Sequence, residues 1–169
     1  MATQVSSLIG ANLNTASSDA TALFALGTVA LGTDGTRWEY VQATATFVTG
    51  EIVLVNPYGT AKSVTLGLWT ANADGYDIGF AQGLINQGEN AWVAKQGRRL
   101  YVLCTGTITA GNNTGVGLAS GQSGRLGTEP AAAVGGTMFG CFITSSTPTD
   151  SGTVVTQATI TWPRLAQKQ

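Results

Sequence analysis

The chain has 169 residues and a formal net charge of -1, and only 10% of its residues are charged, against about a quarter in ordinary soluble proteins. Its length fits one domain around a single core. The 8 Lys and Arg residues are scattered, whereas nucleic-acid binding needs clustered cations, so no nucleic-acid partner is expected.

The sequence also predicts no membrane partner. The first residues, MATQVSSLIG, lack the basic region and the apolar core of a secretory signal. No apolar run approaches the roughly 20 residues of a membrane span. We therefore expect a soluble product that is made in the cytoplasm.

The composition predicts an all-β fold. Glycine occurs 23 times, and the many threonines are β-branched and uncharged, which suits strands joined by tight turns. We predict a single antiparallel domain, barrel-like or sandwich-like, with roughly eight to ten short strands, an extended N-terminal arm and a long Gly-, Thr- and Ser-rich loop. The arm is predicted over residues 1–18, the β domain over 19–163 and a C-terminal tail over 164–169.

The predicted arm carries isolated apolar residues without strand or helix periodicity. It is either a frayed terminus or a segment that becomes ordered on a partner, and its candidate contacts are Val5, Leu8 and Ile9. Beyond the arm two alternatives stay open: a short helix over residues 19–26, or a strand over residues 23–31.

Asp34-Gly35 supplies the positive φ angles of a tight hairpin. A strand is predicted next, over residues 37–48, and its apolar side chains change faces midway. Such a strand either bends or is covered on both sides. Trp38 and Tyr40, on its first apolar face, are either core residues or candidate contacts with a partner.

Residues 51–56 are apolar on both faces and predict a buried strand, which the turn Asn56-Pro57-Tyr58-Gly59 ends. The alternation over residues 63–68 predicts a half-exposed strand. Residues 72–77 predict a further turn. This turn lacks the full ligand set of a calcium loop, so no metal site is expected.

Residues 90–104, NAWVAKQGRRLYVLC, predict a hairpin of two strands that bends at Gly97. Trp92 then faces the second strand in the core. Arg98 and Arg99 lie at the bend, where they are either a solvated turn or a docking point for carboxylates of a neighbour.

The glycine-rich residues 106–130 predict a long exposed loop or a pair of short strands. Asn112 and Asn113 are candidate partner contacts within it. Residues 135–144 and 153–162 predict two further strands, and Pro163 is expected to end the second.

The residue types predict no catalytic site. The chain contains no histidine, which removes the usual general base, the common nucleophile pairs and the commonest metal ligand. Most of the acids lie in turn-like contexts, which indicates structural roles. Cys104 and Cys141 are not at metal-ligand spacing, and we predict two buried thiols, with a disulfide as the alternative. We expect no enzyme activity, no cofactor and no metal.

Three segments resemble small virion proteins of tailed bacteriophages, among them head decoration (cement) proteins. They are LGTVALGTDGTRWEYVQATATFVTGEIVLV (26–55), IGFAQGLINQGENAWVAKQGRRLYVLCTGTITAG (78–111) and GGTMFGCFIT (135–144). One departure is Ala91, which precedes Trp92 where such proteins often have glycine.

The resemblance implies a protein that binds the major capsid protein on the outside of a phage head and stabilises the contacts between capsomers. It implies self-association, most often as a trimer, and a place on the capsid surface of the virion. The alternatives are another phage structural component, such as a head-fibre, neck or tail protein, or a carbohydrate-binding β module. An exposed aromatic platform would favour the last.

Overall fold

The computed structural model describes most of the chain, and the described part is all β. It covers residues 21–64, 76–106, 108, 116–118, 123–128, 138–144 and 153–165. Within these ranges the chain forms strands and turns, which confirms the all-β prediction, and it has no helix that could span a membrane. Residues 21–26 are not helical, and a strand begins at Val29.

The described residues form ten strands. In chain order they are β1 (Val29–Leu31), β2 (Arg37–Ala43), β3 (Ile52–Val55), β4 (Thr60–Ser63), β5 (Asp77–Ala81), β6 (Asn90–Thr105), β7 (Val116–Leu118), β8 (Leu126–Thr128), β9 (Met138–Ile143) and β10 (Thr153–Leu165). Two of them are not short, because β6 has 16 residues and β10 has 13.

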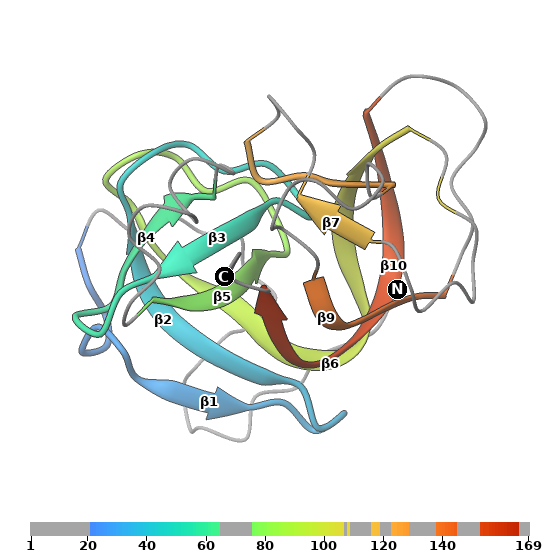
Figure 1. Cartoon of the computed structure of the whole chain (residues 1–169). Helices are drawn as coiled ribbons and strands as arrows, with labels where there is room; N and C mark the ends of the chain where they lie inside the picture. Colours follow the sequence, from blue (N-terminus) through green and yellow to red (C-terminus); the bar gives the residue numbers. More distant parts are fainter. Residues whose placement is uncertain are drawn as a thin grey trace.

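Hydrogen bonding between strands closes a ring. β2 pairs with β4, β4 with β3, β3 with β5, β5 with β6, and β6 returns to β2 (Figure 1). β1 lies antiparallel to β2 outside this circuit. The prediction of an antiparallel domain holds for most pairs, but β2–β4 and β6–β8 are parallel.

The C-terminal half of β6 belongs to a second sheet. From Gly97 onward β6 pairs with β10, and β10 pairs with β9. On its other side β6 pairs with β8 at Cys104, and β8 pairs with β7. Figure 1 shows β6 curving beneath β5 and rising beside β10, so one strand joins the ring to the second sheet.

The predicted hairpin at Gly97 is wrong, because residues 90–105 form one continuous strand. Gln96 still pairs with Arg37 of β2, and Gly97 already lies opposite Ile160 of β10. Glycine is needed here for space, since a Cβ at position 97 would lie 2.6 Å from Thr36 Oγ1. The chain bends through a β-bulge and not through a turn.

Pro163 does not end the last strand, because β10 continues to Leu165. The register with β9 jumps between Ile160 and Arg164, and Pro163 lies within this irregularity. A proline is tolerated at such a position because its missing N–H is not needed for a regular ladder bond. The domain and tail limits at 163 and 164 stay predictions, and so does the arm limit at 18.

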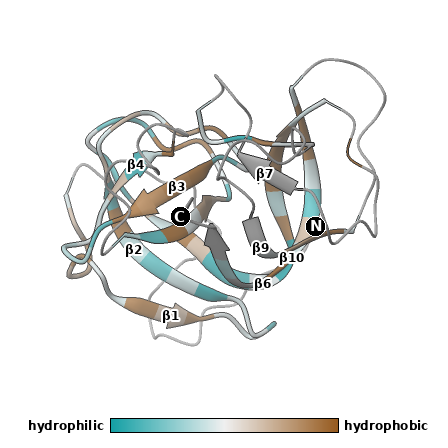
Figure 2. Cartoon of the chain, viewed as in Figure 1, coloured by the Kyte–Doolittle hydropathy of each residue, from teal (hydrophilic) through white to brown (hydrophobic). Residues whose placement is uncertain are grey.

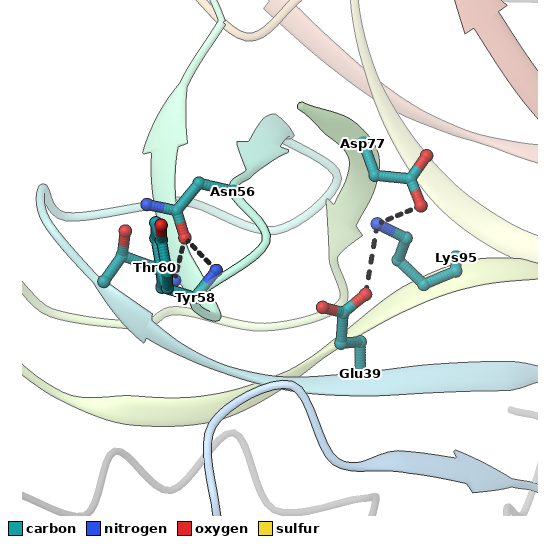
Figure 3. A network of polar contacts seen from close by, with 6 residues as sticks. All are labelled: Glu39, Asn56, Tyr58, Thr60, Asp77 and Lys95. Carbon is teal, nitrogen blue, oxygen red and sulfur yellow. Dashed lines mark hydrogen bonds and ion pairs between the residues drawn. The ribbon is translucent and has the colours of Figure 1, made fainter. Parts of the chain in front are cut away.

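The predicted turns in the first half are confirmed where they are described. Gly35 has φ 80°, and Asp34 Oδ1 accepts the Thr36 N–H at 3.0 Å. Asn56 Oδ1 accepts the N–H groups of Tyr58 and Thr60 (Figure 3). The strand predicted over residues 63–68 is described only to Val64, and the turn over 72–77 lies mostly outside the described residues.

Both faces of the ring strands β2, β3, β5 and β6 carry buried residues, which form two separate clusters. β3 is apolar along its whole length (Figure 2), and all of its residues are buried. In β2, Trp38 and Tyr40 belong to the larger cluster, while Val41 and Ala43 belong to the smaller one. The change of apolar face that the sequence shows in this strand therefore reflects cover on both sides. The smaller cluster contains Val41, Ala43, Phe47, Val53, Val55, Ala61, Ala81, Ile85, Ala91 and Val93.

Candidate functional site

The candidate contacts Trp38 and Tyr40 are core residues. Their exposed fractions are 1% and 2%, so neither presents its side chain to a partner, and the contact role predicted for them is corrected. Tyr40 instead packs on Phe24 and Trp92, with ring centroids 5.3 and 5.1 Å away. Its hydroxyl accepts the Leu23 N–H at 3.2 Å. These contacts hold residues 23–24 against β2 and β6.

Trp92 is also unavailable as a sugar platform, because it is 7% exposed and is covered by Phe24 and Tyr40. Among the residues whose side chains the structure describes, which leave out Phe139 and Trp162, the exposed aromatic residues are Tyr58, on the β3–β4 turn, and Tyr101, on β6. They come from separate elements and do not belong to one stacked group. The carbohydrate-binding alternative therefore lacks its expected feature in this part of the chain.

Lys95 joins three strands through ion pairs. Its Nζ lies 3.3 Å from Glu39 Oε2 of β2 and 3.2 Å from Asp77 Oδ2 of β5 (Figure 3). The ammonium makes no hydrogen bond of standard geometry, so these contacts are electrostatic pairs. Lys95 is buried, whereas the Asp77 side chain is 73% exposed. The trio neutralises a buried charge and fixes β2, β5 and β6 together.

Glu51 is a buried carboxylate, and its bonds are structural. It accepts hydrogen bonds from the Val48 N–H and the Ser63 hydroxyl. Gly124 lies against its side chain, and the Gly124 carbonyl accepts the Ile52 N–H at 2.8 Å. The backbone of Gly124 thus joins the segment before β8 to the ring strands, and the Glu51 side chain packs against it. In the part of the chain that the structure covers, no three His, Cys, Asp or Glu residues gather as a metal site.

Cys104 and Cys141 are free and buried, as predicted. Burial raises the pKa of each thiol to about 12, and the neighbouring Cys104 adds to the effect at Cys141. Both therefore stay protonated at neutral pH, which is the state of inert core thiols rather than nucleophiles.

The second sheet presents an uncharged outer face. Tyr101 and Val155 are exposed on it, the latter at 43%, and Thr159 lies opposite Phe142. At the Thr153 end of this face, Arg125 Nη1 donates a hydrogen bond to Thr153 Oγ1 at 2.7 Å, so the Arg125 guanidinium has a partner within the chain. We call this surface the β6–β10–β9 face. Its side chains are Tyr101, Leu103, Thr105, Phe142, Thr153, Val155, Gln157 and Thr159, and of these Leu103 is buried.

Arg98 and Arg99 are the candidate contacts that the structure places on the surface. Both are exposed, at the β-bulge where two residues of β6 oppose the single residue Thr159 of β10. Arg99 has φ 56°. Among the described residues, every other positive φ belongs to a glycine. The remaining candidates, Val5, Leu8, Ile9, Asn112 and Asn113, lie outside the described residues.

Sequence reasoning missed the β6–β10–β9 face, although a signal for it was present. The buried residues Ala158 and Ile160 alternate with Val155, Gln157 and Thr159 on the other side of β10. An alternating strand with uncharged residues on its solvent side is the pattern of such a face. No protein-family model matches the chain, and no curated protein matches it.

Proposed function

We propose that this chain is a capsid decoration (cement) protein of a tailed bacteriophage. It binds the major capsid protein on the outside of the head as an oligomer of itself, with a trimer as the expected form, and stabilises the contacts between capsomers. In this proposal it performs no chemistry. Its place is the capsid surface of the virion.

The observation that carries the proposal is the β6–β10–β9 face. Interface centres are depleted of charged residues and enriched in aromatic ones, and this face combines Tyr101, Phe142 and Val155 with neutral polar side chains. Docking of such a face requires no charge to be desolvated without a partner. Because the face is formed by hydrogen-bonded strands, binding also orders little extra backbone.

The ionisable groups support a structural role over a catalytic one. The buried Lys95 and Glu51 are each engaged with neighbouring strands or turns, and the thiols are buried with a raised pKa. The segments that resemble decoration proteins form β1 to β3, β5, β6 and β9, which include four of the five ring strands and the two strands on either side of β10 in the second sheet. The resemblance therefore concerns the framework that supports the proposed docking face.

Cosedimentation with undecorated heads of the parent phage tests the proposal. We expect saturable binding with a fixed copy number per head, and heads that withstand heat or chelator better when the protein is bound. Absence of binding to heads, together with binding to isolated tails or necks, would reassign the protein to another part of the particle. A monomer that binds glycans and not heads would favour the carbohydrate-binding alternative.

A further inference from the structure

The β-bulge in β6 leaves two adjacent arginines exposed. In a regular strand, neighbouring side chains point to opposite faces, so one of Arg98 and Arg99 would point toward the buried side of β6. At this bulge the residues before and after resume the alternation, with Leu100 buried and Tyr101 exposed. Both arginines are exposed because Arg99 adopts a left-handed conformation.

An arginine at that position is unexpected from backbone preference alone. Glycine adopts a φ near +56° freely, whereas a side chain disfavours it. The other positive φ angles that the structure describes belong to glycines. Strained backbone positions of this kind concentrate at functional sites. The guanidinium of Arg99 is therefore a candidate for a functional contact.

The two guanidinium groups are also unengaged within the described chain. Other cations are occupied: Lys95 pairs with two carboxylates, Lys62 lies 4.2 Å from the centre of the Tyr76 ring, and Arg125 donates to Thr153. Arg98 and Arg99 have no ion pair with any described residue. Their donors are therefore available to a molecule outside the chain.

We infer that Arg98 and Arg99 form a docking point for a carboxylate-rich protein surface. A guanidinium binds a carboxylate through two parallel N–H···O bonds, and adjacent guanidiniums fit two neighbouring acidic side chains. A nucleic-acid backbone needs a longer row of cations than these two arginines provide. The partner is thus an acidic protein surface.

This docking point adjoins the β6–β10–β9 face, because both arginines lie opposite Thr159 at the bulge. The other side chains of the face are uncharged, whereas the arginine pair selects a partner by charge and orients it on approach. The inference does not rest on the proposed function, because carboxylate recognition at the bulge is testable without any particle. If the protein does decorate a head, the arginine pair predicts acidic side chains on the capsid surface that it meets.

The test is an NMR titration of the ¹⁵N-labelled full chain. A short poly-glutamate peptide is added at low salt, with a poly-glutamine peptide of the same length as its control. We expect the backbone and side-chain N–H signals of Arg98 and Arg99 to shift with a Kd on the order of millimolar, and the shifts to disappear in high salt. The poly-glutamine peptide should leave these signals in place.

Two double variants distinguish an effect of these two arginines from a general effect of the net charge. Arg98→Gln/Arg99→Gln should lose about tenfold or more in affinity, whereas Lys62→Gln/Arg125→Gln removes the same charge from engaged cations and should lose far less. Arg99→Gly gives a further check, because it keeps the bulge and should bind more weakly while folding normally. Equal losses in the two double variants would overturn the inference. Tighter binding of a short DNA duplex than of poly-glutamate at the same signals would also overturn it.

Discussion

Gly124 lies directly against the side chain of Glu51. A Cβ at position 124 would overlap Glu51 Cγ and lie 2.8 Å from Oε1, and Gly124 has φ 65°. Glu51 cannot move away without giving up its bonds to the Val48 N–H and the Ser63 hydroxyl. We expect Gly124→Ala to lower the free energy of unfolding by about 2–4 kcal/mol, as strain and overpacking combine.

The matched control for that change is Gly35→Ala. Gly35 has a similar φ of 80°, but nothing lies within 4 Å of its Cβ position. It should therefore show the backbone penalty alone, about 1 kcal/mol. Urea unfolding of both variants measures the difference, and equal losses would show that the close contact with Glu51 is not important.

Lys95 provides the second stability prediction. Lys95→Met leaves the half-buried Glu39 carboxylate without its cation, and we expect a loss of about 2–4 kcal/mol in the free energy of unfolding. Asp77→Asn removes the exposed partner, whose side chain is 73% exposed, and should cost less than about 1 kcal/mol. Thermal or urea unfolding checks both, and an equally large loss at Asp77 would contradict this division of roles.

The buried thiols predict a loss of stability at alkaline pH. Burial raises the pKa of Cys104 and Cys141 from 9.0 to about 12. Above pH 9 the unfolded chain releases these protons while the folded chain keeps them, so the folded state is favoured less as pH rises. The thiol contribution is constant below pH 9 and falls between pH 9 and 12, by up to about 1.4 kcal/mol per pH unit for each thiol.

The double variant Cys104→Ala/Cys141→Ala isolates this effect from that of other groups. Its unfolding free energy should fall less steeply over the same pH range than that of the wild type. Native thiols should also resist alkylation at pH 8 and react after unfolding, since Cys104 is fully buried. Rapid alkylation of the native protein would contradict the burial of the pair.

A charge on the β6–β10–β9 face should weaken docking while leaving the fold intact. Val155→Lys introduces an ammonium that the bound state must desolvate, whereas Val29→Lys on β1 is its control at nearly the same exposure, 42% against 43%. Both should change the unfolding free energy by within about 0.5 kcal/mol. In binding to undecorated heads, we expect Val155→Lys to lose at least about tenfold in affinity and Val29→Lys to bind as the wild type does.

The parts of the fold that could be predicted depend on short-range chemistry. Asp34-Gly35 carries its own turn signal, and residues 52–55 are apolar on both faces, so the hairpin and the buried β3 follow from local sequence. The burial of Trp38 and Val41 on opposite faces of one strand also agrees with their alternation. Such features need no information about distant residues.

The predictions from sequence were wrong at positions where residues far away in the chain determine the conformation. Gly97 resembles a turn residue, but its small size is required by Thr36 of the β1–β2 hairpin. The left-handed position belongs to Arg99, a residue type that gives no signal for it. Pro163 fits within β10 because an irregular register with β9 accommodates it. The arginine pair was a predicted candidate, but its presentation by a bulge depends on the pairing of β6 with β10.

A map of the phage particle at a resolution that traces strands tests the central claim most directly. We predict density for this chain on the outer surface of the head, with the β6–β10–β9 face turned toward the capsomers and the face side chains Tyr101 and Val155 buried against them. Density in the neck or tail, or a head-bound chain whose β6–β10–β9 face is turned to solvent, would contradict it.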